Sequence, residues 1–546
     1  DSYKMQLMRS FEENDSRAIL YVYSFISGAD WADEVARIDR MSKITKQDVV
    51  EWANKYLGPE SYAIIYKREG KDPDEQKIAA PKITPIVTNR DSQSEFLSEI
   101  QTSQVQPIEP VFVDYKKDMS QFEAQPGIDV LYKKNETNDI FTLIYVFNTG
   151  TENDPALNLA FNYLSYLGTD KMTAEEIASE MYDIACSFYM NAGANQSSIQ
   201  ITGLSENMGK AMEIVEGLIA GAKPDEAILE NLKGDMLKSR ADAKLNQSRC
   251  FGALQRYLFY GGDFIRRTTL TDPALQALTS EQLLAKIGGL MGKQHEVLYY
   301  GPQKETEIKS ALAEHHKVAA DLQPLEKKFS ALLPTDANKV VLAQYDAKQL
   351  YYLQFSNRGE KFDVAADPEI TLYNEYFGGG MNTIVFQEMR EARGLAYSAW
   401  ATLATPSNAN GDYSYYAFIA TQNDKMQKAV EAFDDIINNM PESEKAFGIA
   451  KEALVSRLRT ERTVKDGVLW SYLRARDLGL DAPRDKQIFE KVQAMTLADV
   501  KAAQEKWVKN RKYVYGILGD IQDLDLNYLK TLGPIQTVSQ EEIFGY

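Results

Sequence analysis

Apolar and polar positions follow two different periods along this chain, and they predict where its strands and helices lie. SSIQITGL (197–204) alternates as a half-buried strand does, and DIFTLIYVFNTG (139–150) has the composition of a strong strand. PALNLAFNYLSYLG (155–168) and TAEEIASEMYDIACSFYM (173–190) carry apolar residues at helical spacing, and Thr173 is a candidate N-cap for the second helix.

The same order returns in the second half of the chain. The strand QLYYLQFSNRG (349–359) is followed by helical sequence up to Arg390, then by the strands LAYSAWATL (395–403) and DYSYYAFIATQ (412–422), and then by more helices. Helices cluster after strands, and adjacent strands can pair as hairpins. We therefore expect an α+β fold in which helices pack on one face of a largely antiparallel sheet.

A short unit occurs three times. ITKQDVVEWANKYLGPESYAIIYKREG (44–70), LTSEQLLAKIGGLMGKQHEVLYYGP (278–302) and MTLADVKAAQEKWVKNRKYVYGILGD (495–520) each predict a short helix, a turn and an aromatic-rich strand that ends at a glycine. The copies are more than about 200 residues apart, too far for a solenoid, so we interpret each as the end of a duplicated domain. Each helix begins after a threonine that can serve as N-cap: Thr45, Thr279 and Thr496.

This repeat divides the chain into domains and connections. The first connection is polar and punctuated by proline, which is typical of a linker, with one short helix near SEFLSEI. The predicted boundaries are the tail of a truncated domain at 1–70, a linker at 71–109, a complete domain at 110–325, a linker at 326–337, a complete domain at 338–520 and a carboxyl-terminal tail at 521–546.

The composition and the acidic net charge limit the kinds of partner that this chain is expected to bind. Of the 546 residues 44% are hydrophobic, which is enough to fill several packed cores. The 79 acidic and 61 basic residues give a net charge of −18, and the sequence has no basic run. Nucleic acid and anionic membrane surfaces are therefore poor partners, because both are bound by clustered Lys and Arg.

The two cysteines, Cys186 and Cys250, do not form a CxxC pair, so no disulfide framework or thiolate zinc site is predicted, and whether they pair stays open. No apolar run approaches the ~20 residues of a membrane span. The chain opens with DSYKMQLMRS (1–10), without Met and in helical sequence, so we expect that a preceding part was removed. The compartment stays open: we expect a soluble chain, and a periplasmic or other extracytoplasmic location is compatible with a signal lost upstream.

FGGGMNTIVFQEMREARGLAYSAW (377–400) resembles a segment of the M16 (insulinase/pitrilysin-type) metallopeptidases, in which a glycine-rich turn precedes a helix ending in Arg, then Gly-Leu, then Tyr at a strand start. The repeated domain ending is similar to theirs too, so the resemblance covers residues 1–520. It implies duplicated α+β domains, four of which form a clamshell as one chain or as two half-length chains. This chain would be the carboxyl-terminal half, with the end of domain two and all of domains three and four.

The zinc site of that family uses His-x-x-Glu-His on a helix and a Glu further downstream. Histidines four apart share one helix face, and the Glu between them can act as general base to a zinc-bound water. This chain lacks the motif. We predict that its three histidines, His295, His315 and His316, are exposed to solvent, because the first lies in a turn and the other two are neighbours on a polar helix.

The resemblance also indicates where the ligands would lie. Counting back from Gly168, the ligand positions fall on Leu159, Asn162 and Tyr163, whose side chains cannot replace two imidazoles and a base. Residues 231–250 contain no Glu for the third ligand. We therefore expect zinc in the complete enzyme and none on this chain.

Arg390 and Tyr397 match, residue by residue, the Arg and Tyr that this half of the family presents to the zinc site across the clamshell. The resemblance implies that they orient the substrate and stabilise the oxyanion, for which a guanidinium and a phenol are suitable donors. From the residues alone, a surface Arg and a core Tyr are the simpler interpretation. We expect Gly394 to end the helix and Arg393 to be a helix C-terminal cation.

The main functional hypothesis is a non-metal-binding half of a zinc endopeptidase. It would close the chamber, bind unstructured peptide and supply Arg390 and Tyr397 to a zinc held by a missing amino-terminal half, on the same polypeptide or on a partner chain. The first alternative is a non-catalytic M16-like scaffold or partner subunit. The second is a peptide-binding module that acts without hydrolysis.

Three other segments have simpler structural interpretations. GGGMNT (378–383) lacks the Lys that follows a P-loop, so we predict a tight turn. YLFYGGDFIRR (257–267) could line a peptide groove, but a helix-terminating turn is the better interpretation. LYYLQF (350–355) is predicted to be core sheet, with an exposed edge that adds a peptide strand as the alternative.

Overall fold

The computed structural model of the chain describes residues 2–70, 94–104 and 106–546. Two compact units divide it: residues 1–6 with 109–546, and residues 7–108. Much of the predicted linker lies outside the described residues. The short helix expected near its end is present as α6 (Glu95–Thr102), which Ser94 caps through a hydrogen bond from the amide of Leu97.

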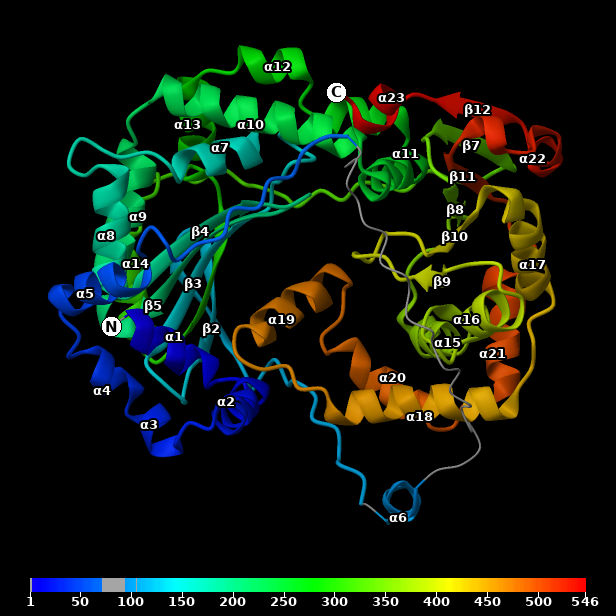
Figure 1. The fold of residues 1–546 in the computed structure, drawn as a ribbon, viewed down its shortest axis with the longest axis horizontal. Helices are drawn as coiled ribbons and strands as arrows, with labels where there is room; N and C mark the ends of the chain where they lie inside the picture. The colour runs from blue at the N-terminus through cyan, green and yellow to red at the C-terminus, as the bar shows by residue number, and fades with distance from the viewer. Residues whose placement is uncertain (1, 71–93, 105) are drawn as a thin grey trace. The chain divides into compact units, whose positions relative to one another are not determined.

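The larger unit is built on two six-stranded sheets with helices around them (Figure 1). The strand orders are β1-β2-β6-β3-β5-β4 and β12-β7-β11-β8-β10-β9. Most neighbours are antiparallel, and β2–β6, β7–β11 and β7–β12 are parallel. The predicted α+β class with duplicated sheets is confirmed. The strands are β1 (Ser120–Gln125), β2 (Ile128–Lys134), β3 (Ile140–Phe147), β4 (Cys186–Ala192), β5 (Ser197–Leu204), β6 (His295–Gly301), β7 (Lys339–Gln344), β8 (Gln349–Ser356), β9 (Ser398–Ala404), β10 (Ser414–Gln422), β11 (Val514–Gly519) and β12 (Ile535–Val538).

Helices follow the strands of each sheet along the chain. Those between β3 and β7 are α7 (Leu157–Leu164), α8 (Ala174–Asp183), α9 (Met208–Gly221), α10 (Glu226–Lys244), α11 (Gln247–Thr268), α12 (Asp272–Ala277), α13 (Ser280–Leu290) and α14 (Glu305–His315). Those after β8 are α15 (Asp367–Tyr373), α16 (Ile384–Phe386), α17 (Met426–Asn438), α18 (Glu444–Thr460), α19 (Gly467–Asp477), α20 (Arg484–Val492), α21 (Leu497–Ala503), α22 (Leu526–Leu532) and α23 (Gln540–Phe544).

The stretch predicted as one helix over 173–190 is divided in the structure. Thr173 does cap α8, in a capping box with Glu176. The helix ends at Asp183, however, and CSFYM belongs to β4, the edge strand paired with β5. Ala185, with φ of +50°, turns the chain between the two elements. The helical prediction is wrong there because backbone pairing with β5 outweighs the local pattern.

Two copies of the repeated unit have the predicted form. Thr279 and Thr496 each open a helix with a capping box, and the strands β6 and β11 follow. Both strands lie in the interior of their sheets, between one parallel and one antiparallel neighbour. The repeat in the sequence is therefore a repeat of the central part of each sheet.

The first copy, in the smaller unit, keeps the helix and not the strand. Thr45 opens α5 (Lys46–Tyr56) with a capping box. Residues 62–66 do not form the predicted strand, and Ile65 and Tyr66 are 92% and 71% exposed. The reason is that a strand needs a neighbour for its backbone groups, and the described part of this unit holds no other strand. The other helices of this part of the chain are α2 (Asn14–Ser27), α3 (Trp31–Val35) and α4 (Arg37–Met41), while α1 (Ser2–Ser10) begins in the residues assigned to the larger unit.

Each sheet of the larger unit is covered on its second face by a helix from the other half of that unit. On β3, Leu143 belongs to the cluster formed with the helices of the first sheet, whereas its neighbour Ile144 packs in a cluster with Leu469 of α19. Alternate residues of a strand point to opposite faces, so α19 lies on the far side of the first sheet. The predicted covering of one face by helices therefore describes only half of the packing.

In the same way, α11, which comes from the half that contains the first sheet, covers the second sheet. Its Leu254 and Leu258 share a cluster with Leu353 of β8. A Cβ on Gly516 of β11 would lie 2.2 Å from Cδ1 of Leu258, so this glycine is what allows the helix to approach the sheet. YLFYGGDFIRR lies within α11, where Gly261 has a non-helical backbone with φ of +82° and ψ of 168° and separates two helical segments, so the predicted helix-terminating turn is present.

Four other points of the sequence analysis can be compared with the structure. LYYLQF lies in β8, which is paired on both sides, so no edge is open at this strand. The residues predicted as a carboxyl-terminal tail fold as α22, β12 and α23, and β12 pairs with β7. Cys186 and Cys250 are both buried and free. Among the residues that the structure describes, no helix is long and apolar enough to cross a membrane.

Candidate functional site

The helix that carries Arg390 has an unusual end. α16 continues directly into a π-helix over Gln387–Ala392. Gly394 follows with φ of +56°, and the amide of Leu395 donates to the carbonyl oxygen of Met389 at 3.0 Å. This hydrogen bond, between residues six apart, spans Gly394 in its left-handed conformation. The helix ends here, as the sequence predicts. Helical turns of the π type are frequent at functional sites, because the wider turn displaces a side chain from its regular position.

Arg390 and Tyr397 are brought together by this turn. The guanidinium carbon of Arg390 lies 5.6 Å from the ring centroid of Tyr397 and 4.9 Å from that of Phe386. Tyr397 is 77% exposed, just ahead of β9, and its amide donates to the carbonyl oxygen of Ala420 at 3.1 Å. The backbone of Tyr397 is thus fixed to the sheet while its phenol extends into solvent. The simpler sequence interpretation, a core Tyr, does not describe this residue.

The donor groups of the pair are free to meet a ligand. The Arg390 side chain is 44% exposed, and its only ion pair with a described residue is a weak one, 3.7 Å from Nε to Oε1 of Glu391. Arg393 is occupied, since its guanidinium lies 3.4 Å from Glu388 and 3.3 Å from Asp435. This contrast supports Arg393 as a structural cation and Arg390 as the available one.

The glycine-rich turn in front of this helix is compact and leaves one apolar side chain exposed. The amide and the hydroxyl of Thr383 both bond to the carbonyl oxygen of Gly380, at 3.0 and 2.7 Å. Met381 at the tip is 72% exposed. The predicted tight turn is therefore present, and Met381 is a surface residue that the sequence did not indicate.

The positions that correspond to zinc ligands have structural roles or face solvent. Leu159, on α7, is buried in the hydrophobic core of the first sheet, and Asn162 is exposed. Tyr163 is fully buried, where its hydroxyl lies 2.7 Å from Oγ of Ser280 and 2.7 Å from the amide nitrogen of Asp225. Within the described ranges no three His, Cys, Asp or Glu side chains come together as metal ligands. Zinc does not fit these residues.

A pocket of about 420 Å³ beside α7 includes one of these three positions, Leu159. Leu159 and Met236 line it, together with the guanidinium groups of Arg240 and Arg256. Arg240 pairs with the carboxylate of Asp272, and Glu152 also lines the pocket.

The prediction that the three histidines are exposed is wrong. His295 and His316 are 4% and 2% exposed, with their Nε2 atoms 2.8 Å apart, and Nδ1 of His316 lies 2.6 Å from Oε1 of Glu216. Burial, and then the neighbouring His316, lower the pKa of His295 to about 4. His315 is also largely covered, with its side chain 14% exposed.

The error has a physical origin. His295 is the first residue of the central strand β6, where every position is buried, and α14 ends at His315, so that His316 leaves the helix and turns inward. The polar neighbours in AEHHKVAA suggested solvent, but the buried Glu216 that pairs with His316 is 100 residues away in the sequence. No local signal could have indicated this pair.

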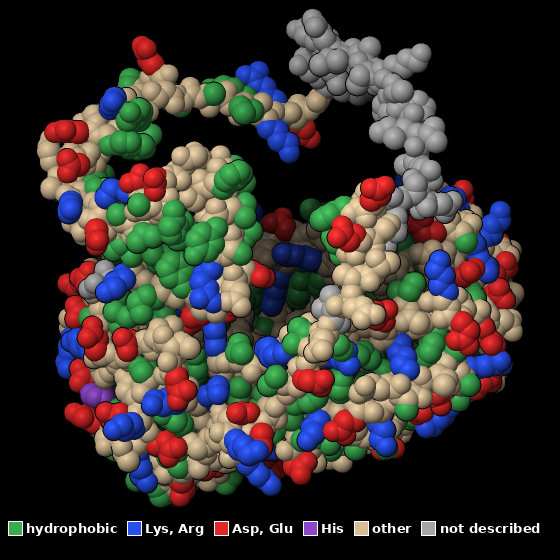
Figure 2. Space-filling view, turned by 90° about the horizontal axis from the view of Figure 1, so that it is seen from below, with side chains coloured by type: hydrophobic (Ala, Val, Ile, Leu, Met, Phe, Trp, Pro, Cys, Tyr) green, Lys and Arg blue, Asp and Glu red, His purple; other side chains and the backbone are tan. Residues whose placement is uncertain are grey.

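Charges of both signs are interspersed over the face drawn in Figure 2, and no single-sign field dominates it.

Parts of the chain are similar to known proteins. Residues 295–454 match the family model described as "Peptidase M16 inactive domain". An uncharacterized zinc protease of Streptomyces coelicolor is 23% identical over 266 residues, which cover 45% of this chain and 56% of the relative. The chain thus spans about half the length of that relative.

Two solved structures share the fold. The peptidase M16 inactive domain from Pseudomonas fluorescens has 18% sequence identity and a TM-score of 0.58, covering 74% of this chain and 98% of that one. The periplasmic protease PqqL from Escherichia coli has 12% identity and a TM-score of 0.57, covering 89% of this chain and 52% of that one. At this identity the likeness is one of fold.

Residues 295–454 are thus similar to the M16 inactive domain, and the duplicated α+β sheets have the fold of M16 domains.

Proposed function

We propose that this chain is the non-metal-binding half of an M16-like zinc endopeptidase and that it presents Arg390 and Tyr397 to peptide held at a zinc site on an amino-terminal half. The observation that carries the proposal is the pairing of these two side chains. They lie at one exposed turn, with a guanidinium stacked near a phenol and neither group committed to a strong partner among the described residues.

The chemistry of the pair suits peptide hydrolysis. Attack on a peptide carbonyl places negative charge on its oxygen, and donors that are already positioned lower the barrier by stabilising that charge. The phenol of Tyr397 can donate one hydrogen bond and the guanidinium of Arg390 several. The water-activating metal belongs to the other half, and the residues of this chain bind and orient the substrate.

The partner half is supported by a second observation, in the smaller unit. In the two other copies of the repeat, the strand after the capped helix lies between two neighbouring strands. Residues 62–66 carry the same aromatic and branched pattern but have no neighbour within the described part of their unit. We infer that this segment completes a sheet of the amino-terminal half, which also buries the side chains of Ile65 and Tyr66.

The test is steady-state kinetics of the enzyme assembled from both halves, with an unfolded peptide as substrate. Arg390→Ala and Tyr397→Phe should each lower kcat/KM by on the order of 10²-fold, because each removes one oxyanion donor. Arg393→Ala, on the same turn but paired with Glu388 and Asp435, is the matched control and should stay near the wild-type value.

Wild-type kcat/KM in both variants would contradict the proposed role and would favour a scaffold subunit. Thermal melting of each variant separates a lost donor from a lost fold. Because Arg390 and Tyr397 are substantially exposed, their replacement should leave the melting temperature of this half nearly unchanged.

A further inference from the structure

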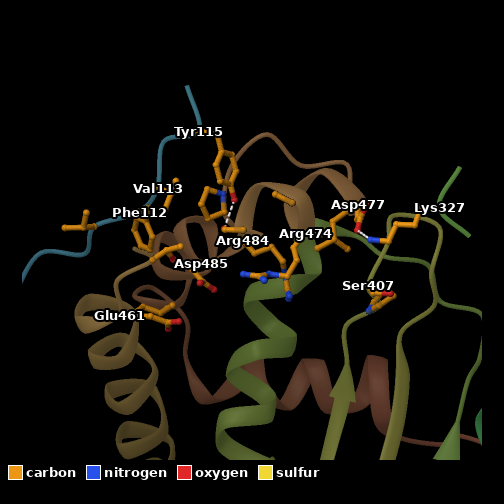
Figure 3. Close-up of a pocket in the computed structure, with 18 of the residues that line it drawn as sticks. Phe112, Val113, Tyr115, Lys327, Ser407, Glu461, Arg474, Asp477, Arg484 and Asp485 are labelled. Atoms are coloured by element: carbon orange, nitrogen blue, oxygen red, sulfur yellow. Dashed lines mark hydrogen bonds and ion pairs between the residues drawn. The ribbon is translucent and has the colours of Figure 1, made fainter. Parts of the chain in front are cut away.

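Charged side chains of the larger unit are buried to different depths. Lys327 and Asp477, whose Nζ and Oδ2 atoms lie 2.6 Å apart, line a pocket of about 440 Å³ around Arg474, where the two halves of the unit meet (Figure 3). Water in that pocket can solvate their charges, which lowers the cost of burying them. A second group of titratable side chains lies between β6, α14 and α9 and is covered more completely.

This group, the histidine–glutamate cluster, consists of His295, His316 and Glu216, which are 4%, 2% and 7% exposed. Aromatic rings form part of its wall. The ring centroid of Tyr145 lies 4.1 Å from that of His316, and the centroid of Phe147 lies 4.6 Å from that of His295. Polar atoms buried among such rings are costly unless each has a hydrogen-bond partner, so we expect every contact within the cluster to be a complete hydrogen bond.

Three short contacts run in series through the cluster. Nδ1 of His295 lies 2.7 Å from the carbonyl oxygen of Lys293, and its Nε2 lies 2.8 Å from Nε2 of His316. Nδ1 of His316 in turn lies 2.6 Å from Oε1 of Glu216. Each hydrogen bond contains one hydrogen, and neither a carbonyl oxygen nor a carboxylate supplies it. The three contacts therefore require three hydrogens from two imidazole rings.

Two neutral imidazoles supply only two of these hydrogens, since each ring has one protonated nitrogen. Without the third, either the two Nε2 lone pairs face each other at 2.8 Å, or a bare Nδ1 of His316 faces the carboxylate of Glu216. Both arrangements bring two electron-rich atoms together where the side chains are more than nine-tenths covered from solvent. The geometry thus points to one additional proton.

We propose that the folded chain holds this additional proton at neutral pH, as an imidazolium at His316. His316 then donates from Nδ1 to Glu216 and from Nε2 to His295, which remains neutral with its own hydrogen on Nδ1. An imidazole is more basic than a carboxylate, which places the proton on His316 and not on Glu216. The cluster has no net charge in this state, and the inference does not depend on the role of Arg390 and Tyr397.

The neighbouring titratable groups are compatible with this assignment. Burial, and then the charge of His316, lower the pKa of His295 to about 4, so His295 can remain the neutral acceptor. Burial, and then the charge of Glu216, raise the pKa of Tyr145 well above its ordinary value, so this phenol keeps its proton.

Other titratable side chains on the elements around the cluster have partners outside it or are exposed. They are Glu213 on α9, Glu314 and His315 on α14, Lys317 after it, and Glu296 on β6. Glu213 and Glu314 lie 3.6 and 3.9 Å from His315, and Glu296 is bound through both oxygens by Arg476. Glu216 also lines a pocket of about 620 Å³, through which protons can exchange with solvent.

The proton connects three parts of the chain. His295 is the first residue of β6, Glu216 lies on α9, and His316 follows the end of α14, where the connection to the second sheet begins. Above about pH 6.5 the unfolded chain has two neutral imidazoles, so the folded chain binds one proton more. The cluster's contribution to stability should therefore be lost as pH rises and the folded chain releases this proton.

The test is urea unfolding of the full chain between pH 7.0 and pH 8.5. One additional proton in the folded state makes the equilibrium constant of unfolding rise by up to tenfold per pH unit. Glu216→Gln keeps an acceptor for Nδ1 of His316 and removes the charge that holds the proton, so its unfolding constant should rise less steeply with pH. Glu213→Gln makes the same change one turn away, beside His315, and should keep the wild-type dependence. Equal dependence in the wild type and Glu216→Gln would overturn the proposal.

A second measurement does not require a variant of the cluster to fold. The chain has three histidines, so labelling histidine with ¹⁵N gives six ring-nitrogen signals, and His315→Gln identifies the two from outside the cluster. In the wild-type chain at pH 7.5, one histidine of the cluster should have both nitrogens protonated and the other only one. Two histidines with one protonated nitrogen each would overturn the proposal.

Discussion

The guanidinium of Arg390 lies over the ring of Tyr397, and the two side chains share one exposed turn although seven residues separate them. The π-helical turn and Gly394 together set this geometry, because the helix must end within a few residues for Tyr397 to reach the sheet. The pair is therefore a single structural unit, and its two members should not be independent of each other.

This dependence gives a prediction about Tyr397. Tyr397→Phe keeps the ring beside Arg390 and removes the hydroxyl, whereas Tyr397→Leu removes both. In the assembled enzyme, kcat/KM of the Leu variant should be lower than that of the Phe variant by roughly two- to fivefold, the value of an exposed cation–π contact of about 0.5–1 kcal/mol. Equal values for the two variants would show that the ring does not position Arg390.

Acid should destabilise the larger unit through His295. The pKa of this imidazole is lowered to about 4 in the folded chain by burial and by His316, against an ordinary value of 6.5. The unfolded chain therefore takes up a proton first as pH falls, so stability is complete above about pH 6.5 and is lost progressively toward pH 4. The free energy of unfolding that is lost through protonation of His295 is on the order of 3 kcal/mol.

Urea unfolding between pH 7.5 and pH 4.5 measures this effect. His295→Gln keeps a hydrogen-bonding group near His316 and cannot titrate, so its free energy of unfolding should depend less steeply on pH than that of the wild type. His315→Gln leaves the buried pair intact and should keep the wild-type slope. A His295→Gln slope equal to that of the wild type would mean that other groups cause the acid sensitivity.

Because α19 comes from the second half of the larger unit and covers the first sheet, the two sheets should unfold together. Leu469 is fully buried in the cluster that α19 forms with the first sheet, so Leu469→Ala should cost about 2–5 kcal/mol. The loss should appear in one cooperative transition when unfolding is followed by circular dichroism and by tryptophan fluorescence. Ile449→Ala, at a position of α18 that is 41% exposed, should change the free energy of unfolding by less than about 0.5 kcal/mol. Separate transitions for the two probes would contradict coupling of the sheets.

Purified chain without its partner half should contain no stoichiometric zinc and should not hydrolyse peptides. The reason is chemical, since Leu159, Asn162 and Tyr163 cannot coordinate the metal and Tyr163 is bonded within the core. Metal analysis by mass spectrometry and a peptide cleavage assay with and without chelator measure both properties. One zinc per chain, or cleavage that EDTA abolishes, would contradict the prediction.

The sequence predicted features that depend on local chemistry. The threonines predicted as N-caps, Thr45, Thr279, Thr496 and Thr173, all cap their helices, each in a capping box with the Asp, Gln or Glu three residues later. Gly394 ends its helix as expected, since the left-handed conformation favours glycine. The α+β class followed from the order of such elements.

Features that depend on distant partners were missed. CSFYM has a helical continuation and becomes a strand because β5 lies beside it, while YAIIY has a strand pattern and no neighbour to pair with. His316 is buried because Glu216 is there to receive its hydrogen bond. The pocket around Arg474 combines residues from both halves of the larger unit, and no short motif indicates it.

The placement of α19 also has a consequence for synthesis on the ribosome. The last strand of the first sheet ends at Gly301, but the helix that covers its second face begins at Gly467. At roughly 5–20 residues per second, that face waits on the order of ten seconds or more for its cover to be translated. A nascent chain in this interval exposes Leu131, Ile144 and Leu298, the apolar surface that chaperones bind. Folding of the newly made chain should therefore depend on chaperones more than the stability of the finished fold suggests.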